Sequence, residues 1–429
     1  MAGLIVGFFV LVLLSGSAIA YLIGASTVIA FLLTGNGEFL AALPQRVLSQ
    51  LDVFAFMAMP LFILVGDLMN RGGVATALID LAMSLMGRLK GGLGHVNILT
   101  SMFFAGVSGS ATADAAAMSN TLVPAMLKRG YSLEYAAAVT AASSVVGPVI
   151  PPSVILIFYG AIMGVSVTAL FVAAIVPGVL LGITLLLVNG VIAHKEDHPG
   201  GANITLPPLL PSIYRALPAI SLPLIILGGV IFGLMTPTES AAVAVFASIG
   251  AGFFYGQMSW SVIRGSLERT LKLSGALFLI LCAIASLSYL LSIERIPQTL
   301  AAFVETSQLS LIGYWLTVNL IFLVAGMVMD IKAAAALLAP VFVPIGLAMG
   351  IDPVHLGIVL CFNLALGLLT PPLGIVLVVI SAVTRVSYWR LVAAVLPFLV
   401  AELFILVLLV LVPDLSLYLP GLLGFLGEP

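Results

Sequence analysis

The chain has 429 residues, of which 62% are hydrophobic and 7% charged, with a net charge of −2 and a mean hydropathy of +1.29. Soluble domains carry about a quarter charged residues, so this composition excludes a soluble protein. No basic arm or patch indicates a nucleic-acid partner. Apolar runs of bilayer-spanning length recur, and we expect about ten to twelve passes or half-passes of roughly 20 residues each. Residues 1–429 therefore form a single polytopic domain surrounded by membrane lipid.

The N-terminus carries an apolar run that continues to Leu33, in which Ala18-Ile19-Ala20 imitates a signal-peptide cleavage site. No positive charge precedes this run, so we expect one or two retained helices, with the number of passes before Val53 left open. The segment from Thr34 to Asp52 is polar enough for a loop or an amphipathic piece. The two cysteines lie inside apolar runs and are expected to be unpaired core residues.

The first unusual stretch runs from Gly91 to Met126, which is apolar but interrupted at residues 106–110. Each arm has only about 15 to 18 residues, which is short for a crossing and suits a re-entrant hairpin whose tip stops inside the bilayer. Lys90 precedes the hairpin and Arg129 follows it, so both feet lie on one basic, cytoplasmic side.

A discontinuous helix follows the hairpin. A helical run begins at Glu134, breaks at the sequence G-P-V-I-P-P of residues 147–152, and resumes to Met163. Proline lacks the amide hydrogen that a helix needs, so Pro151 and Pro152 end the first half-helix.

The same unit occurs a second time after a shift of 220 residues and without any gap. Gly106 falls on Gly326 and Gly147 on Gly367, while the pair Pro151–Pro152 falls on Pro371 and Pro372. The matched residues are those that set backbone shape. We therefore predict a second hairpin with its tip at 326–330 and a second broken helix with its break at 367–372. Duplicated irregular units are typical of transporters built from internal repeats.

Charge places the two copies upside down relative to each other. Repeat one, at about residues 53–192, has basic hairpin feet and a neutral exit from its broken helix. Repeat two, at about 271–412, has acidic feet and a basic exit. Residues 193–217 are the expected joint. The sequence thus predicts an all-α membrane protein with inverted repeats, two re-entrant hairpins and two discontinuous helices.

Broken helices suggest a chemistry. An unwound segment frees backbone carbonyl groups that can replace the water around a sodium ion, and half-helix N-termini attract anions. Two tips that meet two breaks would form a symmetric pair of ion sites with a substrate site between them.

The motifs resemble those of the large membrane subunit of TRAP transporters, the tripartite ATP-independent periplasmic family. The likeness covers essentially the whole chain and is carried by G-V-S-G-S-A-T-A-D (106–114), G-P-V-I-P-P-S (147–153), L-M-T-P-T-E-S (234–240), G-M-V-M-D (326–330) and G-L-L-T-P-P-L-G (367–374). The resemblance implies an elevator-type, sodium-driven importer of carboxylate-containing solutes in the bacterial inner membrane. It also implies two partners, a separate small four-helix membrane subunit and a periplasmic substrate-binding protein. It implies no cofactor besides Na⁺ as coupling ion.

Residues matching the family's ion sites are Ser108, Ser110, Asp114, Gly147, Val149, Gly326, Asp330, Gly367 and Thr370. An intramembrane carboxylate is costly, which makes Asp114 and Asp330 functional candidates. The plainer alternative is that each caps the adjoining half-helix. Substrate-binding candidates are Ser143, Asn363 and Lys332. The plainer alternatives are helix packing for the first two and pairing with Asp330 for the lysine.

Two other functions compete with this hypothesis. A sodium-coupled anion carrier of the same superfamily would work without a binding protein. An intramembrane serine protease would use Ser108 in the sequence G-V-S-G, with His355 as its base. The repeat disfavours the protease, because Val328 and Met329 stand opposite Ser108 and Gly109 and the repeat explains the stretch without catalysis. The solute stays open among C4-dicarboxylates, sialic acids, other sugar acids and ectoine-like compounds.

Overall fold

The computed structural model describes residues 18–200, 206–295, 299 and 310–426. Within those ranges the secondary structure is helical and contains no named strand. Nine of the described helices are long and apolar enough to cross a membrane. This confirms the predicted all-α membrane protein. The expected N-terminal run is described only from Ala18 onward, where helix α2 (Ile19–Leu33) begins; its earlier part lies outside the described residues.

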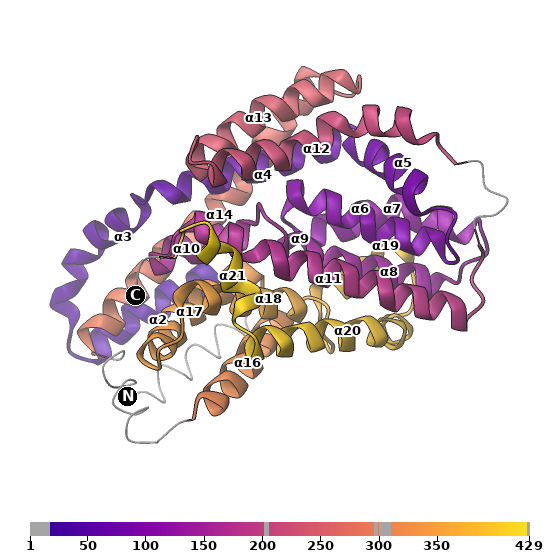
Figure 1. Cartoon of the computed structure of the whole chain (residues 1–429). Helices are drawn as coiled ribbons and strands as arrows, with labels where there is room; N and C mark the ends of the chain where they lie inside the picture. Colours follow the sequence, from indigo (N-terminus) through magenta and orange to yellow (C-terminus); the bar gives the residue numbers. More distant parts are fainter. Residues whose placement is uncertain (1–17, 201–205, 296–298, 300–309, 427–429) are drawn as a thin grey trace.

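One group of helices, here called the frame, lies along the left and the top of Figure 1. Within it, α13 lies on α4 and α12, and α14 lies on α2, α3 and α4. Its members are α2, α3 (Leu43–Leu51), α4 (Ala58–Arg71), α5 (Val74–Met86), α12 (Leu209–Ile231), α13 (Pro237–Phe254) and α14 (Trp260–Ile293).

The remaining helices form a second group, here called the bundle. Two hairpins, α6–α7 and α16–α17, accompany two broken helices, α8–α9–α10 and α18–α19, as predicted. The bounds are α6 (Gly92–Ser108), α7 (Ala111–Leu127), α8 (Leu133–Ser144), α9 (Val146–Val149), α10 (Val154–Met163), α11 (Val167–Lys195), α16 (Leu311–Val328), α17 (Ile331–Ala348), α18 (Pro353–Gly367), α19 (Ile375–Thr384), α20 (Tyr388–Leu411) and α21 (Asp414–Leu422).

The two repeats pack on each other reciprocally. The second arm of hairpin one, α7, lies against α19, and the second arm of hairpin two, α17, lies against α10. A shift of 220 residues converts one pair into the other. In Figure 1 the first hairpin and α19 lie toward the right, and the second hairpin and α10 lie toward the left. The copies therefore enter the bundle from opposite ends, which agrees with the inversion predicted from charge.

Two frame helices are longer than the sequence suggested. Helix α12 begins at Leu209, inside the segment 193–217 that we expected to be the joint. The reason is that Pro211 falls in the first turn, where a missing amide hydrogen costs no helical bond. Helix α14 runs unbroken for 34 residues, well beyond the roughly 20 residues that we expected for one pass. Ser259 caps its start by accepting a hydrogen bond from the Val262 amide.

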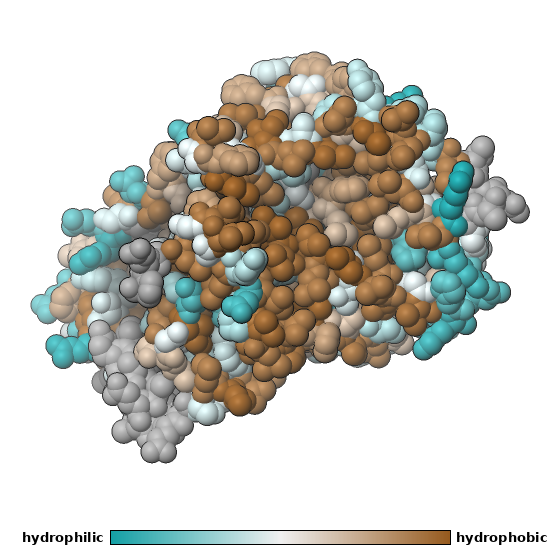
Figure 2. Space-filling model, in the orientation of Figure 1, coloured by the Kyte–Doolittle hydropathy of each residue, from teal (hydrophilic) through white to brown (hydrophobic). Residues whose placement is uncertain are grey.

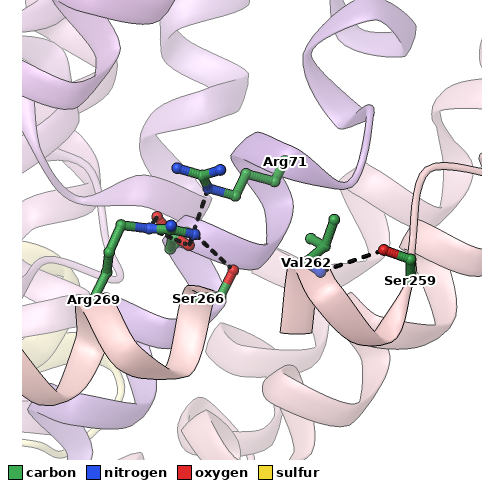
Figure 3. A network of polar contacts seen from close by, with 6 residues as sticks. Arg71, Ser259, Val262, Ser266 and Arg269 are labelled. Atoms are coloured by element: carbon green, nitrogen blue, oxygen red, sulfur yellow. Dashed lines mark hydrogen bonds and ion pairs between the residues drawn. The ribbon is translucent and has the colours of Figure 1, made fainter. Parts of the chain in front are cut away.

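A charged network fastens α14 to α4 within the frame. The Arg269 guanidinium donates from Nε to Asp67 Oδ1 at 3.0 Å and from Nη2 to Asp67 Oδ2 at 2.7 Å. Arg71 approaches the same carboxylate at 3.4 Å, and Ser266 accepts a further bond from Arg269. Figure 3 shows Arg71 from α4 and Arg269 and Ser266 from α14 pointing toward one another. Such bidentate pairs are stronger than single neutral hydrogen bonds, so this contact fixes how the two helices cross.

The surface agrees with a membrane position. Figure 2 shows apolar side chains covering the middle of the visible face, with hydrophilic ones gathered toward its two ends. Large exposed apolar residues on the span helices include Leu187, Leu224, Leu316 and Leu411. Apolar residues facing outward across the length of a span are what contact with lipid tails requires.

Candidate functional site

Tip one is built by a left-handed glycine. Helix α6 ends at Ser108, and Gly109 adopts φ +57°, a region that favours glycine. A Cβ atom on Gly109 would lie 3.3 Å from the Pro152 carbonyl oxygen and 3.5 Å from the Val154 amide nitrogen. The first tip therefore touches the first break directly.

A buried carboxylate completes this contact. Asp114, in the first turn of α7, has no exposed surface. A Cβ atom on Gly147 would lie 2.7 Å from Asp114 Oδ2 and 3.6 Å from the Ala111 amide nitrogen. Gly147 is therefore the position at which the carboxylate and the helix start approach the broken helix, and only the absence of a side chain leaves room for them.

Break one loses its regular hydrogen bonds because of its prolines. In a helix, each amide donates to the carbonyl four residues earlier, so Pro151 and Pro152 cannot bond Gly147 and Pro148. The Ser153 hydroxyl donates to the Pro148 carbonyl instead. The peptide bond between Pro151 and Pro152 is cis, as is the one between Pro371 and Pro372 in the second copy.

Tip two meets break two through two glycines. A Cβ atom on Gly326 would lie 2.7 Å from the Leu364 carbonyl oxygen and 3.1 Å from Gly367 Cα. A Cβ atom on Gly367 would in turn lie 2.6 Å from the carbonyl carbon of Gly326. The backbones thus touch, and neither position has room for a side chain.

Break two retains local bonds around its carbonyls. The Thr370 amide donates to the Gly367 carbonyl at 3.0 Å, and the Thr370 hydroxyl donates to the Leu366 carbonyl at 2.8 Å. A carbonyl oxygen has two lone pairs, so one bond leaves the Gly367 oxygen able to accept another. Proline removes the donor from position 371.

Asp330 differs from Asp114 in its surroundings. It is the N-cap of α17, accepting a bond from the Lys332 amide at 2.9 Å. Its other oxygen pairs with Lys332 Nζ at 3.1 Å, and half of its side chain is exposed. The structure therefore contains both of the plainer alternatives: Asp330 caps α17, and Lys332 pairs with Asp330.

Ser143 and Asn363 are fully buried, and each is bonded within its own repeat. The Ser143 hydroxyl contacts Asn97 Oδ1 at 3.1 Å and Ser101 Oγ at 3.0 Å. Asn363 Nδ2 donates to Asn319 at its backbone oxygen, 2.9 Å, and at Oδ1, 2.6 Å. Each bond set ties a broken helix to the first arm of the neighbouring hairpin.

The other candidates take varied places. Ser110 is the extended N-cap residue of α7, with Oγ 3.4 Å from Thr112 Oγ1. Val149 is buried in α9. The side chain of Ser108 lies outside the described residues. Among the described residues, no hydrogen bond or ion pair joins Ser143, Asn363 and Lys332 to one another.

Sequence reasoning missed three contributors. Asn97 and Asn319 hold the hairpin arms, and polar side chains inside short apolar arms were a signal that could have found them. Pro223 of α12 was not foreseeable: a Cβ atom on Gly106 would lie 2.8 Å from its ring. Tip one therefore also abuts the frame.

Chemically, the two contacts offer oxygen atoms from backbone carbonyls, hydroxyls and one buried carboxylate. Within the described residues there is no group of three or more His, Cys, Asp or Glu side chains able to hold a metal ion. Oxygen donors suit hard cations rather than the soft metals that thiolates select.

Comparison with known proteins agrees with this architecture. Residues 5–415 match the family described as "Tripartite ATP-independent periplasmic transporter, DctM component". The chain is 37% identical to the C4-dicarboxylate TRAP transporter large permease protein DctM of Pseudomonas aeruginosa, covering 94% of this chain and 93% of that protein. It is 35% identical to the sialic acid TRAP transporter large permease protein SiaM of Vibrio cholerae, covering 93% of each.

The fold also resembles the crystal structure of the Alcanivorax borkumensis YdaH transporter, with a TM-score of 0.67, 16% identity, and coverage of 92% of this chain and 96% of that one. At that identity the likeness concerns the fold alone. The sequence relatives are permease proteins, which excludes the protease hypothesis. The chain belongs to the DctM family and is a multi-pass inner-membrane protein, the large permease of a TRAP transporter.

Proposed function

We propose that this chain is the transport subunit of a sodium-coupled uptake system for a carboxylate-containing solute. The observation that carries the proposal is the pair of tip–break contacts. In one repeat Gly109 lies against Pro152 and Asp114 against Gly147, and in the other Gly326 lies against Gly367. In repeat one the contact brings the start of α7 close to a proline-interrupted helix, and in repeat two it brings the end of α16 there. A proline-interrupted helix offers backbone oxygens that can coordinate a cation. Two such sodium sites then flank the solute.

The solute class rests on the relatives. The names of the two large permeases give C4-dicarboxylate for one and sialic acid for the other, at 37% and 35% identity. Both solutes are carboxylates, and the identities do not favour one over the other. A carboxylate fits beside the start of α17, where the helix dipole and Lys332 attract negative charge. When the solute binds, its carboxylate replaces Asp330 as the ion-pair partner of Lys332.

The proposed cycle moves the bundle against the frame as one body. A periplasmic binding protein delivers the solute on the outer face, and a separate small four-helix membrane subunit extends the frame. The division into two helix groups in Figure 1 supports this elevator motion. The sodium gradient and the membrane potential drive it, each net charge moved being worth about 2.3 kcal/mol per 100 mV.

The test is solute uptake into proteoliposomes that contain the chain and its small subunit, with C4-dicarboxylates and sialic acid as first solutes. The sodium gradient is imposed or collapsed, and the binding protein is added or omitted. Uptake that requires the gradient and the binding protein supports the proposal. Sodium-driven uptake without a binding protein replaces it with the stand-alone carrier. Uptake that is equal with potassium in place of sodium rejects the ion sites.

A further inference from the structure

A second carboxylate lies deep in the bundle, on a helix that neither tip uses. Glu402 falls in the second half of the α20 span and has no exposed surface. In the part of the chain that the structure describes, neither of its carboxyl oxygens has a hydrogen-bond partner. It faces the interior of this chain rather than lipid or a neighbouring subunit.

Its immediate surroundings are apolar. The same face of α20 buries Phe398, Leu399, Ile405 and Leu406. Helices α8, α11, α18 and α19 pack against α20, and α21, which follows α20 in the chain, packs on α11 and α18. A charged neighbour that compensates Glu402 would have to come from one of these helices or from α20 itself.

The charged groups of α8, α11 and α20 lie at the helix ends. Glu134, at the start of α8, is 3.6 Å from Arg390, in the first turn of α20. Tyr135 donates to Asn189. On α11, the His194 ring contacts the Gly190 carbonyl, and Lys195 is the last residue of the helix. The Tyr388 hydroxyl donates to the carbonyls of Pro372 and Leu373.

The other three helices offer no partner either. On α18, the His355 ring contacts the Ser416 hydroxyl of α21 at 2.7 Å, and the Cys361 thiol is directed at the Ile155 carbonyl. Helix α19 has no ionisable residue within its bounds and ends before Arg385. On α21, Tyr418 is exposed and Asp414 occupies the first turn.

An ionised carboxylate in such a place is costly by several kcal/mol or more, whereas the neutral acid costs far less. Binding of a proton from water converts the ionised carboxylate into the neutral acid. We propose that Glu402 is a proton-binding site of the bundle, occupied when the helices around α20 are packed. It is separate from the tip–break contacts and independent of the solute.

The sign of the pH effect follows. At neutral pH the folded chain keeps the proton on Glu402, while the unfolded chain loses it. The folded state then binds more protons, so its stability falls as the pH rises. Glutamine keeps the shape of the neutral acid without titrating. Glu402→Gln should therefore be more stable than the wild type at alkaline pH and should show a weaker dependence on pH.

Infrared spectroscopy of the full chain in lipid nanodiscs tests the proton directly. We expect a protonated-carboxyl C=O band in the wild type at neutral pH that shifts in heavy water, disappears in Glu402→Gln and moves in Glu402→Asp. Glu134→Gln, which removes a partly exposed carboxylate, is the matched control and should leave the band unchanged. A band that survives Glu402→Gln, or no such band in the wild type, overturns the proposal.

Thermal unfolding of the same samples from about pH 6 to about pH 9 gives a second readout. The wild type and Glu134→Gln should lose melting temperature as the pH rises, and Glu402→Gln should lose less. If the melting temperature falls with pH to the same extent in all three proteins, Glu402 is not the proton site. If Glu402→Gln does not fold, the pH titration of the infrared band in the wild type and in Glu402→Asp still decides the question.

Discussion

The two hairpin tips have equivalent helix boundaries but different side-chain chemistry. In both copies a helix starts at equivalent positions, Ala111 and Ile331, and a glycine of the break contacts the tip. In copy one the carboxylate is buried against Gly147, whereas in copy two it is half-exposed and paired with Lys332. Equivalent helix boundaries therefore do not give the two tips equivalent side-chain ligands.

The two carboxylates differ in their surroundings because they occupy different positions at the starts of α7 and α17. Under the 220-residue shift, Asp330 corresponds to Ser110, and both are N-caps. Asp114 corresponds to Ala334, so copy two has no carboxylate one turn inside its helix. We infer that the repeat preserves the cap and the glycine contact, while Asp114 belongs to copy one alone.

The largest effects should come from the break glycines. Gly367→Ala places a methyl group against the Gly326 backbone, which cannot move aside, and overpacking of this kind costs about 1–3 kcal/mol or more. Gly147→Ala meets the Asp114 side chain, which can rotate, so its loss of stability should be smaller. Melting temperature and uptake are measured for both variants.

Two further variants serve as a control and a rescue for the glycine substitutions. Gly228→Ala, in α12, has nothing within 4 Å of the added carbon and should behave like the wild type. Adding Asp114→Ala to Gly147→Ala should restore stability without restoring transport. Equal losses for Gly147→Ala and Gly367→Ala, unaffected by Asp114→Ala, would contradict the distinction between side-chain and backbone contact.

The next largest effect should distinguish the two carboxylates, Asp114 and Asp330, by the sodium dependence of uptake. Asp114→Asn should raise the sodium concentration for half-maximal uptake by roughly tenfold or more, equivalent to about 1.4 kcal/mol of binding free energy. Asp330→Asn keeps a competent cap and loses only a partly exposed ion pair, so sodium dependence should be nearly unchanged. Sodium titrations of uptake measure both. A shift in Asp330→Asn as large as that in Asp114→Asn would make the copies equivalent after all.

Smaller effects are expected at the polar contacts that hold the hairpin arms. Asn363→Ala removes two hydrogen bonds to Asn319, and Ser143→Ala removes its hydroxyl from Asn97 and Ser101. Each variant loses two interhelical hydrogen bonds of about 1 kcal/mol each. Asn363→Ala also removes a larger buried side chain and leaves a cavity, so it should lower the melting temperature more. Ser143→Ala should transport at a reduced rate with unchanged solute KM. A raised KM in either variant would instead favour a direct contact with the solute.

The smallest effect is expected outside the tips. Lys90 pairs with Asp197 and holds the pKa of that fully exposed carboxyl below its usual range. A depressed pKa stabilises the fold above the usual value and loses this effect as the pH falls, so Asp197→Asn can differ from the wild type only above about pH 4. Exposed pairs contribute little, and we expect indistinguishable melting curves. A clearly lower melting temperature for Asp197→Asn would show that this pair, in the joint between the repeats, contributes more to stability than the contacts at the tips.

Local signals in the sequence predicted much of this arrangement. Glycine marks both tips, and glycine and proline mark both breaks, because these residues act on the backbone within a turn. Lysine and arginine at the feet of the first hairpin, and acidic residues at the feet of the second, indicate their opposite orientations. The carboxylate over Gly147, the partners of Ser143 and Asn363, and the contact of Gly106 with Pro223 depend on how helices rotate against one another. No local pattern encodes that rotation. The early start of α12 was missed because Pro211 was read as part of a connecting segment rather than as a first-turn residue.

Direct binding of radioactive sodium to the purified chain in nanodiscs tests the sodium site at the first tip and break without requiring transport. We predict saturable binding that excess unlabelled sodium displaces and potassium does not. We also predict weaker binding in Asp114→Asn and wild-type binding in Asp330→Asn. The absence of saturable sodium binding, or equal binding in all three proteins, would contradict the assignment of an ion site to the first tip and break.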